Sequence, residues 1–108
     1  MDKVKLSVDL GKKILQTQHE FYVDSHGEDL DHITNIKRII VTISEFLKSE
    51  SVSESKINSA VKHLKELAKS LYIDEAISQR SKAEDENDIR KESIIWFDYI
   101  YEHEEYPR

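Results

Sequence analysis

The chain has 108 residues and no cysteine, with 38% hydrophobic residues, 35% charged residues and a net charge of −6. This length is close to the commonest domain size and predicts a single domain over residues 1–108. The absence of cysteine excludes thiolate metal sites, catalytic thiols and disulfides. The longest apolar run, residues 94–97, is too short to cross a bilayer. We therefore expect a cytoplasmic protein without a membrane segment or a secretion signal.

The first stretch with a hydrophobic pattern can be interpreted as a strand or as a helix. Val4, Leu6, Val8 and Leu10 alternate with polar residues, as in an edge strand. No second alternating run is present to pair with them, and an unpaired strand would leave its backbone groups without hydrogen bonds. A helix over about residues 3–24 is therefore favoured.

A second helix is predicted after residues 25–28, where Ser25 and Glu28 have the spacing of a capping box. The apolar residues of this helix recur at steps of three and four along one side: Leu30, Ile33, Ile36, Ile40, Ile43 and Leu47. Ile39, Val41 and Phe46 widen the apolar surface beyond one stripe. These three side chains could face another chain, so a homo-oligomer or a subunit of a helical assembly stays open.

A third helix is predicted after the serine-rich residues 49–55, where Ser51 and Glu54 again have capping-box spacing. Its apolar side is regular from Ile57 to Leu71. Residues 74–77 either finish this helix or form a short separate one. The predicted fold class is therefore all-α, a small antiparallel bundle of four, or possibly five, helices.

A fourth helix is expected to start near residue 82, because Ser81 and Glu84 have capping-box spacing as well. Residues 78–88 contain almost nothing apolar to bury, so we expect this segment to be mobile and the helix to pack only from Ile89 to His103. Residues 82–108 thus form a C-terminal helix and tail. Residues 81–108 carry a net charge of −5, whereas residues 1–80 carry −1.

The aromatic residues of the last helix divide between two sides. Trp96 and Phe97 share an arc with isoleucines and are predicted to lie in the core. Ile95 and Tyr99 lie on the opposite side among carboxylates, a combination that suits binding to a basic partner protein. The predicted partner-binding residues are Ile95, Asp98, Tyr99, Glu102, Glu104, Glu105 and Tyr106.

The histidines and acidic residues near the start of the second helix could form a metal site. Glu28 and His32 lie one helical turn apart and could share a divalent cation with His26. Carboxylates also gather at helix N-termini because unpaired amides carry partial positive charge there, and we favour this explanation. No glycine-rich phosphate loop and no nucleophile motif is present, so we expect no cofactor, no metal and no enzymatic activity.

Residues 44–67 provide the main alternative function. A helix, a serine turn and a lysine-bearing helix resemble in outline the helix-turn-helix of DNA-binding regulators. The acidic balance of the chain argues against binding to nucleic acid. The favoured expectation is a non-catalytic binding protein whose acidic C-terminal segment docks on a basic protein. Immunity proteins, antitoxins and phage inhibitors that cover the basic clefts of nucleases have a similar charge, and the comparison rests on charge alone.

Overall fold

The computed structural model describes residues 2–108, and these residues form four helices joined by short turns. The helices are α1 (Lys3–Ser25), α2 (Asp29–Ser49), α3 (Glu54–Arg80) and α4 (Glu86–His103). No strand occurs in the part of the chain that the structure describes, so the predicted all-α class is confirmed. The short fifth helix is not formed, because residues 74–77 belong to α3, which continues unbroken to Arg80. No helix within residues 2–108 is long and apolar enough to cross a membrane.

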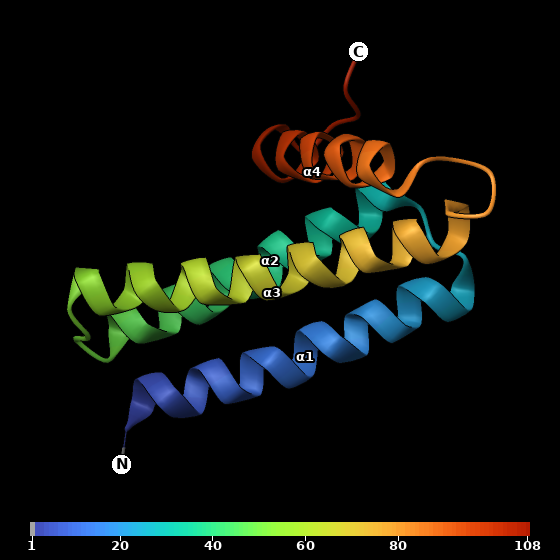
Figure 1. The fold of residues 1–108 in the computed structure, drawn as a ribbon. Coiled ribbons are helices and arrows are strands. Elements are labelled where there is room, and N and C mark those ends of the chain that lie inside the picture. Colours follow the sequence, from blue (N-terminus) through green and yellow to red (C-terminus); the bar gives the residue numbers. More distant parts are fainter. Residues whose placement is uncertain (1) are drawn as a thin grey trace.

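The helices are arranged in layers about the pair α2 and α3, which run antiparallel side by side (Figure 1). Helix α1 packs against both of them on one side, and α4 packs against both on the opposite side. Helices α1 and α4 do not contact each other within the described chain. Every helix pair except α1 and α4 is in contact, which supports the predicted helical bundle, with α1 and α4 on opposite sides of the α2–α3 pair.

The core consists of two neighbouring clusters. The larger one joins all four helices around buried side chains that include Leu15, Ile36, Leu64 and Phe97. The smaller one lies toward the turn between α2 and α3 and contains Leu47, Ile57 and Ala60. The prediction that Trp96 and Phe97 are both core residues is confirmed for Phe97, which is fully buried, while Trp96 is partly buried against the larger cluster.

Gly11 marks the closest approach of α1 to the α2–α3 pair. A β-carbon at this position would lie 2.8 Å from Ile43 Cδ1 and 3.0 Å from Leu64 Cδ2. Both distances are shorter than carbon–carbon van der Waals contact, which is about 3.5–4.0 Å. A β-carbon at this position would therefore require the ends of the Ile43 and Leu64 side chains to shift.

The N-terminal caps differ from those predicted from the serine–glutamate spacings. Ser25 lies in the last turn of α1, where its hydroxyl donates to the Phe21 carbonyl at 2.6 Å. Ser51 has φ of 60° in the turn after α2, and Ser81 follows the end of α3. The expected start of α4 near residue 82 was therefore wrong, and this helix begins at Glu86. Aspartates cap the two ends that have a side-chain cap, Asp2 for α1 and Asp85 for α4.

Candidate functional site

The predicted partner-binding residues are divided between α4 and the tail that follows it. Four of them lie on α4, on the side that faces away from the core, and we call Ile95, Asp98, Tyr99 and Glu102 the α4 outer face. The other three, Glu104, Glu105 and Tyr106, lie in the tail. Ile95 is 68% exposed and is not covered by any other part of the molecule. The α4 outer face thus has an apolar side chain free for contact.

Intramolecular contacts involve two residues of the α4 outer face. Asp98 forms an ion pair with Lys69 of α3 at 2.9 Å. The Tyr99 ring lies 4.3 Å from the His103 ring, and its hydroxyl donates to Glu105 at 3.4 Å. Ile95 and Glu102 are therefore the members of the face that stay most accessible.

The end of the tail turns away from the α4 outer face. Glu104 has φ of 56° and ends α4 in the left-handed conformation, which redirects the chain. The Tyr106 hydroxyl accepts a hydrogen bond from the Leu30 amide at 3.3 Å, and its ring lies 5.8 Å from Trp96. Tyr106 therefore attaches the end of the tail to the start of α2 and lies away from the α4 outer face, whereas Glu105 stays in contact with Tyr99 of that face.

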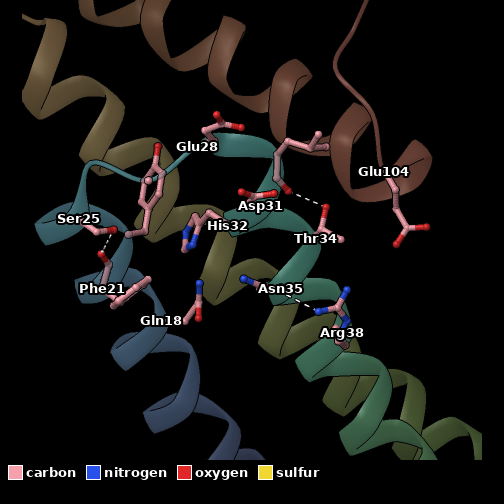
Figure 2. Close-up of a pocket in the computed structure, with 13 residues that line it drawn as sticks. Gln18, Phe21, Ser25, Glu28, Asp31, His32, Thr34, Asn35, Arg38 and Glu104 are labelled. Atoms are coloured by element: carbon pink, nitrogen blue, oxygen red, sulfur yellow. Dashed lines mark hydrogen bonds between the residues drawn. The ribbon is translucent and has the colours of Figure 1, made fainter.

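A groove of about 530 Å³ lies between the end of α1 and the start of α2 (Figure 2). Its lining includes Glu28, Asp31 and Arg38 of this region, and Glu104 contributes from the other side. In Figure 2 the Arg38 guanidinium donates a hydrogen bond to Asn35, at 3.3 Å. The lining combines three carboxylates and the Arg38 guanidinium with neutral polar and apolar side chains, so it offers both hydrogen-bond donors and acceptors.

A buried polar cluster next to this groove was not predicted from the sequence. The Tyr22 hydroxyl donates to the Asp29 carboxylate, and the Tyr72 hydroxyl donates to the same carboxylate at 3.2 Å. Burial and the Asp29 carboxylate raise the pKa of both tyrosines. Both hydroxyls therefore stay protonated and connect the ends of α1, α2 and α3. Tyr72 lies 43 residues from Asp29 in the sequence, so no local spacing could have indicated this contact.

His32 lies at the centre of this region and stacks on Tyr22, with ring centroids 4.0 Å apart and an interplanar angle of 6°. Its Nδ1 is buried without a hydrogen-bond partner. Burial, with a smaller contribution from the nearby His19, lowers the pKa of His32 to about 4. The imidazole is therefore neutral at pH 7 and serves as a packed aromatic side chain.

A metal site formed by His26, Glu28 and His32, the alternative considered from the sequence, is not supported by this geometry. His32 is buried against Tyr22, whereas His26 and Glu28 are exposed in the turn between α1 and α2. Within residues 2–108, no three histidine or acidic side chains are grouped in a way that could hold a metal ion. The acidic residues at the start of α2 fit the ordinary preference of helix N-termini for negative charge.

The lysines of α3 form part of a mixed surface beside α4. Lys65 lies 4.5 Å and Lys37 5.8 Å from the centroid of the Tyr101 ring, and Lys69 pairs with Asp98. Helices α2 and α3 lie side by side in an antiparallel hairpin, whereas a helix-turn-helix sets its two helices about 90–120° apart. Residues 44–67 therefore do not have the crossing geometry of a helix-turn-helix.

Comparisons of the chain with protein-family models, with curated proteins and with solved structures found no match.

Proposed function

We propose that the protein is a non-catalytic binding protein whose α4 outer face docks on a basic surface of another protein. The observation that carries the proposal is Ile95, which is 68% exposed in the middle of a helix rich in carboxylates. An exposed apolar side chain surrounded by charge is typical of a docking surface, where the apolar group gives affinity and the charges give orientation and association rate.

The charge of the C-terminal segment supports a basic partner. Residues 81–108 have a net charge of −5, and Glu102, Glu104 and Glu105 follow Ile95 in the chain. Nucleases and other enzymes that act on nucleic acids carry basic clefts, because they bind the phosphate backbone. We therefore propose that the partner is such an enzyme and that the protein inhibits it, in the manner of an immunity protein, an antitoxin or a phage inhibitor.

The first experiment identifies the partner. The protein is immobilised, exposed to cell lysate and washed with increasing salt, and the retained proteins are identified by mass spectrometry. We expect a basic nucleic-acid enzyme that is released as the salt screens the carboxylates. Added in excess, the protein should then block that enzyme's activity on DNA or RNA. Capture of no basic protein, or a captured enzyme that stays fully active, would contradict the proposal.

The second experiment tests the surface by calorimetry with the captured enzyme. We expect Ile95→Ala and Tyr99→Ala each to weaken binding by tenfold or more, because buried apolar anchors usually outweigh charges at the rim. Glu102→Gln should weaken binding only a few fold. Val41→Ala, at an exposed apolar position on α2, is the matched control and should leave the affinity unchanged. Equal losses from Ile95→Ala and Glu102→Gln would contradict the role of an apolar anchor.

A further inference from the structure

Helix α1 carries a row of large apolar side chains on its outer side. Leu6 is 55% exposed, Leu10 56%, Ile14 39% and Phe21 67%. The steps of four, four and seven residues place all four side chains on one side of the helix. We call this row the α1 stripe. Single exposed apolar residues are ordinary on soluble proteins, but four large ones on one side of a helix, interrupted only at Thr17 and Gln18, mark a contact surface.

Helix α2 extends the α1 stripe sideways. Ile39 and Ile43 line a groove together with Ile14, and Phe46 further along α2 is 47% exposed. Val41, which was predicted to belong to the same surface, lies on a different side of α2 by its helical position. The apolar surface is about 22 Å long, since fifteen residues separate Leu6 from Phe21 at a rise of about 1.5 Å per residue.

The charges of α1 divide between its two halves. Residues 2–13 contain four lysines and two aspartates, a net charge of +2, and residues 14–25 contain Glu20 and Asp24, a net charge of −2. In an antiparallel pair centred on the middle of the helix, Lys3, whose ammonium also pairs with Glu50, lies beside Asp24 of the copy, whereas Lys12 and Lys13 lie near the centre. Complementary charge of this kind selects one orientation over the other.

We propose that the occupant of this surface is a second copy of the chain, related by a two-fold axis that passes close to Lys13 and Ile14. A two-fold axis makes the same surface meet itself, which an apolar row with opposite charges at its two ends permits. In this register Leu6 lies opposite Phe21 of the second copy, and Lys3 lies opposite Asp24 of the second copy. Helices α1 and α2 of both copies would form a four-helix layer across the interface.

The main test is sedimentation equilibrium over a range of about 1–500 μM, which covers dissociation constants from the micromolar to the sub-millimolar. We expect the wild type to dimerise and Leu10→Asp to weaken the dimer by at least tenfold. Circular dichroism shows whether Leu10→Asp still folds, and Thr17→Asp, a smaller exposed position on the same side of α1, provides a second disruptive variant.

The matched control is Ile95→Asp, which places a charge at an apolar position on α4 that is more exposed than Leu10. It should leave the dimer intact while abolishing binding to the proposed basic partner. Failure of the dimer and failure of the proposed function are therefore distinguishable. A wild type that stays monomeric throughout the range, or a dimer that resists both α1 variants, would overturn the proposed self-association. A monomer would indicate that the α1 stripe binds a different chain.

The antiparallel register has its own test, since the chain contains no cysteine and single cysteines can be introduced cleanly. In a glutathione redox buffer, Ile14→Cys should form a disulfide-linked dimer because this position lies beside its own copy at the two-fold axis. Leu6→Cys should not, because the two copies of residue 6 would be about 22 Å apart along the helix. Cross-linking through residue 6 as efficient as through residue 14 would indicate a parallel pair and contradict the proposed arrangement.

Discussion

Gly11 controls how closely α1 approaches the rest of the core. In an open helix, Gly→Ala would stabilise the protein by up to about 1 kcal/mol. At this position the new methyl group would lie 2.8 Å from Ile43 Cδ1 and 3.0 Å from a carbon of the fully buried Leu64. Overpacking costs about 1–3 kcal/mol, so we expect Gly11→Ala to lower the free energy of unfolding by about 1 kcal/mol in urea denaturation.

Ile43→Val provides the matched background for this prediction, because valine lacks the Cδ1 atom that makes the shortest contact. In that background, Gly11→Ala should be less destabilising than in the wild type, or neutral. If Gly11→Ala lowers the free energy of unfolding equally in both backgrounds, contact with Ile43 is not the cause of the destabilisation.

His32 should make the stability of the protein depend on pH. Its pKa falls from 6.5 to about 4 on folding because of burial, so the unfolded chain binds the proton more tightly. The contribution of the neutral His32 to the free energy of unfolding is fully present above the pKa of histidine in the unfolded chain. It is lost as the pH falls from about 6.5 to 4. The full difference corresponds to about 3 kcal/mol. We expect this loss to appear in urea unfolding at a series of pH values.

The variant His32→Phe keeps an aromatic ring beside Tyr22 and removes the titrating group. The loss of stability between pH 7 and pH 4.5 should therefore be smaller in His32→Phe than in the wild type. His63→Gln, at an exposed position on α3, is the control and should keep the dependence of the wild type. If His32→Phe and the wild type lose the same stability, the pH dependence arises from carboxylates instead.

At the scale of the helices, the turn between α2 and α3 contains one residue in an unfavourable backbone conformation. Ser51 has φ of 60°, a conformation that glycine adopts at lower cost than other residues. Ser51→Gly should therefore raise the free energy of unfolding by up to about 1 kcal/mol. Ser53 in the same turn has φ of −63° and is the control, since Ser53→Gly should bring no gain. An equal gain from both variants would contradict the conformational explanation.

The start of α4 depends on the carboxylate of Asp85, which accepts hydrogen bonds from the Asn87 amide at 2.8 Å and from the Asp88 amide at 3.3 Å. Asp85→Ala should destabilise the protein by about 1 kcal/mol, the usual value for a lost N-cap. Ser81→Ala should change the stability little. The measurement is thermal or urea unfolding, and a larger loss from Ser81→Ala would place the cap at the residue indicated by the sequence.

The sequence predicted the helices well because their apolar periodicity is local. The first helix was predicted over residues 3–24 and forms over Lys3–Ser25, and the regular third pattern from Ile57 to Leu71 lies within α3. The caps could not be predicted equally well. Serine and glutamate are common in this chain, so capping-box spacings also occur where the preceding helix has not yet ended.

At the scale of the whole molecule, the order of packing could not be predicted, because it depends on contacts between residues far apart in the chain. The predicted seven-residue docking surface is divided for the same reason. Tyr106 reaches the Leu30 amide 76 residues earlier in the sequence, and this contact takes the end of the tail away from the α4 outer face. No pattern within residues 82–108 indicates that the start of α2 lies next to the tail in the folded protein.

The two core clusters should unfold as one unit, since α2 and α3 contribute to both of them. Ile57→Val, in the smaller cluster, should destabilise the protein by about 1 kcal/mol. Helix α4 does not contact this cluster directly. If the domain unfolds cooperatively, the slowest-exchanging amides of α4 should nevertheless lose the same free energy of protection in native-state hydrogen exchange. Unchanged protection in α4 would indicate that the last helix opens independently.

The positions of α1 and α4 on opposite sides of the α2–α3 pair have a consequence for stoichiometry. A two-fold dimer joined through α1 would display one α4 outer face on each of its distant flanks. Such an assembly is bivalent, so it could hold two partner molecules at once or cross-link a partner that is itself multivalent. Because dimerisation depends on concentration, the apparent avidity for the partner would then rise with the concentration of the protein. The abundance of the protein would thus set the strength of its binding.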